Sequence, residues 1–143
     1  MTSNLKILIV DDHVVLRNGL ASLLNLQPDF EIVGEAGTVA EAVLKASKLR
    51  PDLILMDIEL PDGTGVEATK TILSQFPDIN ILMLTIYDSD EKLMNAIRSG
   101  AKGYLLKNTT SKNLIETLRA LGRGEVVFSR EMTGRVITGL TKE

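Results

Sequence analysis

The sequence predicts an α/β fold in which helices cover both faces of a parallel β-sheet. Five short, strand-like apolar runs alternate with five segments whose apolar residues recur at helical spacing. This alternation favours a parallel sheet, because the crossover between two parallel strands needs a helix. The run Leu53–Met56 adds a third observation: it has the length and composition of a strand buried on both faces, and Asp57 and a Pro/Gly turn follow it.

The expected elements follow one another in order along the first 122 residues. Strands are expected over residues 5–10, 30–36, 53–56, 79–84 and 103–106. Helical apolar spacing marks residues 16–24, 39–46, 66–76, 93–97 and 114–121. Residues 30–36 alternate more than the other strands, which favours an edge position. Thr38 and Ser111 are the expected N-caps of the second and fifth helices.

The segment 123–143 has no obvious place in a fold of five such units. It holds a brief apolar patch at 126–128, and then Ser129 as the expected N-cap of a further short helix. We therefore predict a domain over residues 1–122 and a C-terminal linker helix in 123–143 that leads toward an effector domain.

Composition excludes several functional classes. The 143 residues are 44% hydrophobic and 24% charged, which is typical of one globular domain. A net charge of −3 argues against nucleic-acid binding by this chain alone. The absence of cysteine excludes disulfides and thiolate chemistry. No apolar run approaches the roughly 20 residues that span a bilayer, and no signal peptide is apparent, so we expect a cytoplasmic protein without a membrane partner.

Polar residues stand at the carboxyl ends of four of the five expected strands. They are Asp11 and Asp12, Asp57, Thr85, and Lys107. In a parallel sheet they emerge at one edge, where open α/β sheets place their chemistry. Three crowded carboxylates repel one another and raise at least one pKa, unless a hard cation such as Mg2+ binds among them. On the strand alone, an Asp57 that merely caps the next helix remains an equal alternative.

The other two groups favour phosphoryl chemistry at this edge. Lys107 offers a point charge suited to a phosphoryl oxygen, and Thr85 offers a hydroxyl donor. A carboxylate nucleophile, a metal, a lysine and a hydroxyl together describe an acceptor of a phosphoryl group, in which each cation and donor meets developing negative charge. Gly63 and Gly65 are expected to let the backbone approach the site.

These residues resemble, in order, the five-point pattern of response-regulator receiver domains of two-component signalling. The resemblance covers about residues 5–122, and Tyr104, three residues before Lys107, matches the family's aromatic switch position. It implies the flavodoxin-like (βα)5 doubly wound parallel sheet with strand order 2-1-3-4-5. It also implies that Asp57 accepts a phosphoryl group from the phosphohistidine of a sensor histidine kinase.

The remaining roles are implied by the same resemblance. Asp11 and Asp12 hold Mg2+, and Asp57 and the backbone carbonyl of Glu59 complete the protein ligands. Thr85 and Lys107 contact the phosphoryl group, and Tyr104 turns inward as Thr85 moves. This is a two-state switch that changes the face formed by the fourth helix, fifth strand and fifth helix, and with it homodimer formation.

Three further residues near the acids, Glu59, Tyr87 and His13, are expected to have lesser roles or none in the site. Glu59 and Tyr87, each two residues beyond a site residue, flank Asp57 and Thr85 and are expected to tune the lifetime of the phosphoryl group. His13, the only histidine, is expected in the first turn of a helix rather than as a ligand.

The stretch 103–108, Asp11-Asp12-His13 and the tail 124–140 resemble the LuxR-type subfamily, which carries a C-terminal helix-turn-helix domain. No helix-turn-helix is present in these 143 residues, so DNA binding is expected only through an effector domain absent here. The resemblance also implies a domain that modifies itself and turns over no separate substrate.

Three other classes were weighed. A phosphatase of the dehalogenase type needs Asp-x-Asp, whereas this chain has Asp57-Ile58-Glu59 and no room for a cap domain. A flavin-binding protein is disfavoured because the carboxylates repel an FMN phosphate. A degenerate receiver that acts as a phosphorylation-independent interaction module is the main alternative, and failure to bind metal would favour it.

Overall fold

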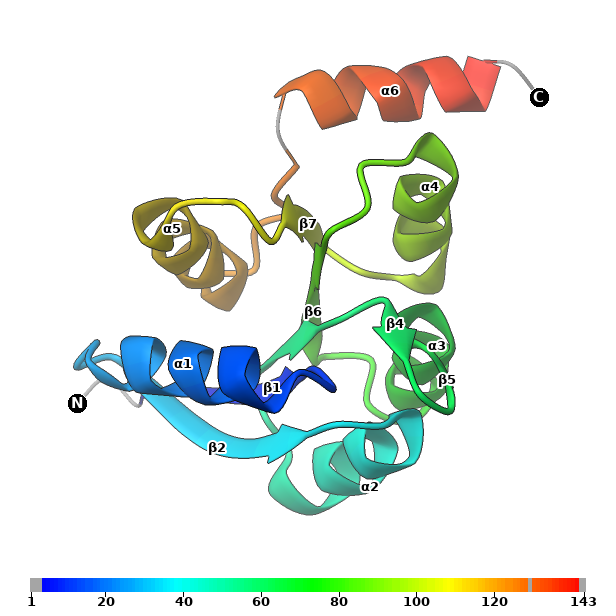
Figure 1. Ribbon diagram of the computed structural model, residues 1–143. Coiled ribbons are helices and arrows are strands. Elements are labelled where there is room, and N and C mark those ends of the chain that lie inside the picture. The colour runs from blue at the N-terminus through cyan, green and yellow to red at the C-terminus, as the bar shows by residue number, and fades with distance from the viewer. Residues whose placement is uncertain (1–3, 129, 142–143) are drawn as a thin grey trace.

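The computed structural model describes residues 4–128 and 130–141, and its centre is a five-stranded parallel sheet (Figure 1). The sheet runs in the order β2-β1-β3-β6-β7, which confirms the predicted order 2-1-3-4-5. The strands are β1 (Leu5–Val10), β2 (Phe30–Ala36), β3 (Leu53–Met56), β6 (Asn80–Thr85) and β7 (Gly103–Leu106). Residues 30–36 lie at the edge, as their alternation predicted.

Helices cover both faces of the sheet, as the strict strand–helix alternation predicted. On one side lie α1 (Val14–Asn25) and α5 (Ser111–Gly122); on the other lie α2 (Val39–Leu49), α3 (Gly65–Gln75) and α4 (Asp90–Ser99) (Figure 1). This arrangement leaves both ends of the sheet open to loops, and the carboxyl ends of the strands carry the predicted site.

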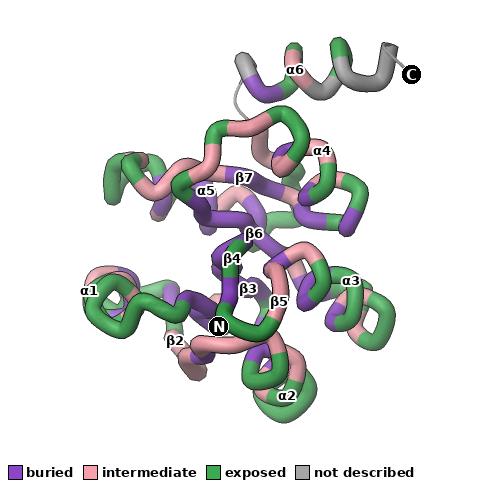
Figure 2. Tube along the Cα trace, turned by 45° about the vertical axis from the view of Figure 1, so that its right-hand side comes forward, coloured by how far each residue is buried: buried purple, intermediate pink, exposed green. Residues whose placement is uncertain are grey.

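The core is divided by the sheet into two clusters, and the strands supply them alternately. In β3, Ile54 and Met56 pack with α2–α4, whereas Leu53 and Leu55 pack with α1 and α5. This follows from the two-residue period of a strand. All four residues are buried, as the colour of β3 in Figure 2 indicates. Each side chain contributes roughly 1.5–3 kcal/mol relative to exposure. Strand β3 is therefore a rigid base for the residue that follows it.

The helix caps agree with the sequence at one position and differ at another. Thr38 caps α2, because its hydroxyl accepts a 3.0 Å hydrogen bond from the Glu41 N–H. The predicted Ser111 cap is wrong: Thr110 is the N-cap of α5 and accepts from the Asn113 N–H at 3.0 Å, so Ser111 is the first helical residue. Adjacent Thr and Ser are both good caps, and the backbone path out of β7 decides between them.

A small hairpin that the sequence presented only as a turn follows β3. Its strands are β4 (Glu59–Leu60) and β5 (Gly63–Thr64). Both carboxylate oxygens of Asp62, at its tip, accept backbone N–H bonds from Val39 and Ala40, at 2.7 and 3.1 Å. The hairpin beside Asp57 is thus tied to the start of α2.

The C-terminal segment forms α6 (Arg130–Thr141), as predicted, but it is not apart from the five-unit fold. It packs against α4 (Figure 1), and Met132 is buried in the core cluster on that side of the sheet. Ser129, the expected cap, lies outside the described residues. Among the helices that the structure describes, none is long and apolar enough to cross a membrane.

Candidate functional site

The predicted site residues gather at the carboxyl edge of the sheet, and the ladder of backbone hydrogen bonds positions them. Just past the strand ends, the Asp11 N–H donates to Ala36 O at 3.0 Å and the Asp57 N–H to Val10 O at 2.9 Å. The Lys107 N–H donates to Thr85 O at 2.7 Å. Each residue therefore leaves the sheet from a fixed backbone, which brings the side chains of Asp11, Asp57 and Lys107 together.

Three carboxylates form an acidic cluster here. Asp11, Asp12 and Asp57 each offer an oxygen, and His13 a ring nitrogen, with all of these atoms within 4.8 Å of one another. Asp11 and Asp57 are buried, whereas Asp12 is exposed. His13 is the N-cap residue of α1 rather than part of its first turn, and its Nδ1 lies 3.0 Å from Asp11 Oδ1. The imidazole is thus closer to the acids than the sequence suggested.

Lys107 lies between the two buried acids. Its Nζ is 2.8 Å from Asp11 Oδ2 and 3.3 Å from Asp57 Oδ2. Burial acts to lower the pKa of Lys107, but hydrogen bonds and charge from Asp11 and Asp57 outweigh it and raise the pKa. The lysine is therefore a firmly charged ammonium that is shared by two carboxylates.

The charge of Asp57 is incompletely compensated by this lysine. Burial, and then the negative charge of Asp11, raise the pKa of Asp57 against the opposing effects of Lys107 and the Glu59 N–H. The repulsion between carboxylates that the sequence predicted is thus present, although burial contributes more than this repulsion to the raised pKa of Asp57. A further cation beside Asp57 would relieve it.

Gly65 brings backbone directly against Asp57. A Cβ at Gly65 would lie 2.1 Å from the carbonyl oxygen of Asp57, so no side chain fits there. The Gly65 N–H also donates to Ile58 O at 2.6 Å, at the start of α3. The expected close approach of backbone at this glycine is confirmed, and it fixes the chain on both sides of Asp57.

Thr85 and Tyr104 are joined through the backbone of Tyr87. The buried Thr85 Oγ1 accepts from the Tyr87 N–H at 3.2 Å, and the Tyr104 hydroxyl donates to Tyr87 O at 2.6 Å. Tyr104 is already turned inward and is only 1% exposed. Burial is the main cause that raises the pKa of Tyr104 to about 12, so the phenol remains a donor at neutral pH.

Glu59 and Tyr87 lie together beside the site, with a lysine that the sequence did not single out. A hydrogen bond between the two side chains raises the pKa of the Tyr87 hydroxyl. Lys92 of α4 places Nζ 3.7 Å from Glu59 Oε1 and 4.5 Å above the Tyr87 ring. Lys92 lies in the first turn of α4, shortly after Tyr87 in the sequence, but only the folded chain brings it near Glu59.

Arg17 is a second residue near the site that the sequence did not single out. It reaches from α1 to donate to the backbone carbonyl of Asp11 at 2.8 Å, while its Nε pairs with Glu35 at 3.0 Å. These contacts hold the loop that carries the acidic pair. Its position, one turn after His13 on an otherwise apolar helix face, was the only signal available.

The donor set of this cluster fits a hard divalent cation. Carboxylate oxygens from Asp11, Asp12 and Asp57 are the ligands that Mg2+ prefers, and the exposed Asp12 leaves one side accessible to water, which Mg2+ retains as ligands. The Glu59 backbone lies beside Asp57, since its N–H bonds to that carboxylate. The role of the Glu59 carbonyl as a ligand remains a prediction.

A parallel sheet in this order, with helices on both faces and acids at its carboxyl edge, is the flavodoxin-like fold of receiver domains. The response regulator receiver domain family matches residues 7–119, and the chain belongs to this family.

Its relatives are response regulators. The chain is 39% identical over 135 residues to the DNA-binding transcriptional activator DevR/DosR of Mycobacterium tuberculosis, covering 94% of this chain and 62% of that protein. It is 44% identical over 128 residues to the response regulator VraR of Staphylococcus aureus, covering 90% and 61%. The chain thus spans less than two thirds of the length of these relatives.

Solved structures agree with this assignment. A LuxR-family two-component response regulator from Aurantimonas sp. SI85-9A1 superposes with a TM-score of 0.89 at 28% identity, over 97% of this chain and 99% of that one. The response regulator domain of Thermotoga maritima CheB superposes with a TM-score of 0.78 at 32% identity, over 84% and 97%. The likeness to the first structure extends beyond the five-unit fold into the C-terminal segment.

Proposed function

We propose that this protein is a phosphorylation-switched receiver in which Asp57 accepts a phosphoryl group from the phosphohistidine of a sensor histidine kinase. The observation that carries the proposal is the position of Lys107 Nζ, 2.8 Å from Asp11 and 3.3 Å from Asp57. A purely structural ion pair needs one acid and one base. Two buried acids around one lysine leave negative charge at the point where a metal and a phosphoryl group would meet it.

The chemistry follows from this arrangement. A carboxylate oxygen of Asp57 attacks phosphorus; the new P–O bond forms as the P–N bond to the histidine breaks, and the imidazole leaves with the electron pair of that bond. Lys107 turns from the carboxylate to a phosphoryl oxygen, and the Thr85 hydroxyl donates to another. Mg2+ held by Asp11, Asp12, Asp57 and the Glu59 carbonyl supplies charge neutralisation when bound. Water later attacks phosphorus as the bond between phosphorus and the Asp57 oxygen breaks, which releases inorganic phosphate and returns Asp57 to the free carboxylate.

The switch acts through the contacts of Thr85. Its hydroxyl accepts from the Tyr87 N–H, and it loses this geometry when it turns toward the phosphoryl group. Because Tyr104 is already inward and bonded to Tyr87 O, phosphorylation stabilises an arrangement that the free protein populates rather than creating it. The loop after Thr85 therefore carries the change, which alters the α4–β7–α5 face and favours a homodimer.

The output is transcriptional control by a longer protein. The relatives extend well beyond this chain, and one of them is named as a DNA-binding transcriptional activator. We propose that α6 links this domain to such a DNA-binding effector domain, with no turnover of a separate substrate. Control through DNA requires that domain, since residues 1–143 carry a net charge of −3.

Intact-protein mass spectrometry tests the proposal. After incubation with Mg2+ and acetyl phosphate or phosphoramidate, the chain should gain one phosphoryl group, which EDTA and Asp57→Ala abolish. Asp78→Asn, an exposed acid at the other end of the sheet, should leave the gain intact. Retention of the group in Asp57→Ala would assign it elsewhere.

A chain that gains nothing from small donors should then be offered a phosphorylated cognate kinase. Failure there too would favour the degenerate receiver, an interaction module that works without phosphorylation. Such a module has no use for Mg2+, so a chain that fails both assays and shows no Mg2+ binding by calorimetry would decide for it.

A further inference from the structure

Helix α6 covers a defined surface of the receiver. It packs against α4 beyond the edge strand β7 (Figure 1). Met132 is 8% exposed and belongs to the same core cluster as Leu93 and Tyr104, and Phe128 packs against that cluster. Figure 2 shows a buried position in the first half of α6 and exposed positions farther along the helix. The contact is thus apolar at one end of the helix.

One turn later, Arg135 adds two ion pairs. Its Nη1 lies 2.5 Å from Asp88 Oδ1, and its Nε pairs with Asp90 Oδ1. Asp88 lies in the loop between β6 and α4, and Asp90 is the first residue of α4. Arg135 is 21% exposed although both acids are largely exposed. A single guanidinium therefore joins α6 to both ends of a three-residue segment.

The same short loop leads to the phosphorylation site. Thr85 accepts from the Tyr87 N–H, Tyr87 O accepts from Tyr104, and Asp88 is the next residue. Two residues separate Thr85 from the first acid that Arg135 holds. A displacement of the backbone at Tyr87 cannot leave the geometry of two ion pairs at Asp88 and Asp90 unchanged.

We propose that the loop 86–89 and helix α4 form a docking surface whose occupant is this chain's own α6, and that phosphorylation of Asp57 weakens this docking. This α6 latch, made by Met132 and Arg135, rests on the proposed function for its trigger. When Thr85 turns to the phosphoryl group, the Tyr87 N–H loses its acceptor, the loop moves, and Arg135 loses the geometry of its pairs. The helix that leads out of the domain is thereby released.

The coupling must act in both directions. If phosphorylation weakens the docking of α6 by a given factor, then the undocked protein favours the phosphorylated state by the same factor over the docked protein. The ion pairs of the latch are also weak enough to be switched, because their acids are largely exposed. A variant that opens the latch should therefore mimic part of the effect of phosphorylation.

Hydrogen exchange measured by mass spectrometry tests docking in the unmodified protein. Arg135→Ala should speed exchange of the α6 amides by about threefold to tenfold, the effect of losing two partly exposed ion pairs. Asp88→Asn should act in the same direction without changing the sequence of α6. Arg123→Ala, which removes the exposed pair with Glu125 outside α6, is the matched control and should leave α6 unchanged. Unaltered exchange in both test variants would overturn the docking.

Phosphorylation supplies the second arm. In the wild type, the phosphorylated protein should show faster α6 exchange, whereas in Arg135→Ala phosphorylation should add little. The phosphorylated fraction at a limiting concentration of donor should be higher in Arg135→Ala than in Arg123→Ala. If the wild type is phosphorylated and the α6 amides exchange no faster, the coupling between phosphorylation and α6 docking is wrong, whereas the proposed function stands. A wild type that gains no phosphoryl group would overturn the proposed function and the trigger, while the first arm still decides the docking.

Discussion

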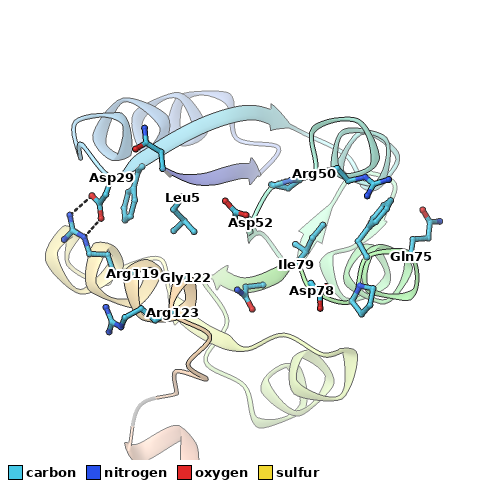
Figure 3. Close-up of a pocket in the computed structure, with 16 residues that line it drawn as sticks. Leu5, Asp29, Arg50, Asp52, Gln75, Asp78, Ile79, Arg119, Gly122 and Arg123 are labelled. Atoms are coloured by element: carbon cyan, nitrogen blue, oxygen red, sulfur yellow. Dashed lines mark hydrogen bonds and ion pairs between the residues drawn. The ribbon is translucent and has the colours of Figure 1, made fainter. Parts of the chain in front are cut away.

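The two ends of the sheet differ in the way that they treat charge. The amino end has the larger hollow, about 920 Å3 in volume, between the loops that precede the strands (Figure 3). At the carboxyl end, the pocket lined by Asp11, Asp57 and Leu84 has no room for a water molecule. By size alone, the amino end would be taken for the functional site.

At the amino end two acids have donors within the chain. Arg119 bonds to both carboxylate oxygens of Asp29, at 2.8 and 3.0 Å, as Figure 3 shows. This hydrogen bonding lowers the pKa of Asp29. Asp52, in the same hollow, accepts from the Lys6 N–H at 2.9 Å. Asp29 and Asp52 are thus satisfied by donors within the chain, and neither of them needs a ligand.

At the carboxyl end the opposite holds. Asp11 and Asp57 share Lys107, and the pKa of Asp57 is raised by burial and by the neighbouring charge. Uncompensated charge is costly for the fold and useful for chemistry, because a metal and a phosphoryl group can relieve it. The comparison teaches that unmet charge, rather than volume, distinguishes the site in this molecule.

The largest difference in stability is expected when a glycine at each end of the sheet is replaced by alanine. Gly65→Ala places a Cβ 2.1 Å from the backbone of Asp57, so we expect the free energy of unfolding to fall by about 3 kcal/mol, the upper part of the overpacking range. Gly122→Ala meets only the side chain of Leu5, at 3.1 Å, and should change stability by less than about 1 kcal/mol. Urea denaturation measures both, and equal effects would show that the site is not the more tightly constrained end.

The next largest difference in stability is expected when the basic residue that pairs with the acids at each end, Lys107 or Arg119, is removed. Lys107→Ala leaves two buried carboxylates without their shared cation and should cost about 2–3 kcal/mol in Mg2+-free buffer. Arg119→Ala leaves the half-exposed Asp29 and should cost less than about 1 kcal/mol. Thermal unfolding at matched ionic strength separates them. Added Mg2+ should restore part of the loss in Lys107→Ala only; restoration in both variants would point to a nonspecific salt effect.

Removing the charge of Asp57 should stabilise the metal-free fold. The folded pKa of Asp57 is raised, so the wild type loses stability as pH rises through that value. Asp57→Asn avoids this loss and should be more stable at pH 7 by about 1 kcal/mol, the low end for a charge pair. The difference in stability between the two proteins should vanish below pH 3.8, because 3.8 is the ordinary pKa of an aspartate. Unfolding free energies measured across pH would contradict this if Asp57→Asn were the less stable protein at pH 7.

The smallest effect is expected at Asp29. Its folded pKa is lowered, so its contribution is present above the unfolded pKa and is lost as pH falls through the folded value. Asp29 is 49% exposed, and solvent screening reduces the contribution to a few tenths of a kcal/mol. Asp29→Asn should therefore be slightly destabilised at pH 7, opposite in sign to Asp57→Asn. Two variants with the same sign would remove the contrast between the ends.

The sheet and its helices could be predicted because each strand is a short apolar run and each helix has its own apolar period. The acids, Thr85 and Lys107 could be placed together because strand ends in a parallel sheet share an edge. Contacts made by long side chains across elements could not be predicted. Arg17, Lys92 and Arg135 reach partners that only the packing of helices brings near.

Local competition explains the other differences. Thr110 and Ser111 are both good N-caps, and the backbone after β7 selected Thr110. The two-residue strands at 59–60 and 63–64 are too short to leave a periodic signal. The described contacts of α6 include those of Met132 and Arg135, which a periodicity argument cannot assign to a partner surface.

The measurement that tests the central claim most directly is an NMR titration of the aspartate carboxyl carbons, with and without Mg2+. Without metal, Asp57 should titrate above the ordinary value of 3.8 and Asp29 below it. Saturating Mg2+ should lower the pKa of Asp57 and leave that of Asp29 unchanged. An Asp57 that titrates below Asp29 in the metal-free protein, or that does not respond to Mg2+, would contradict the account of a site defined by unmet charge.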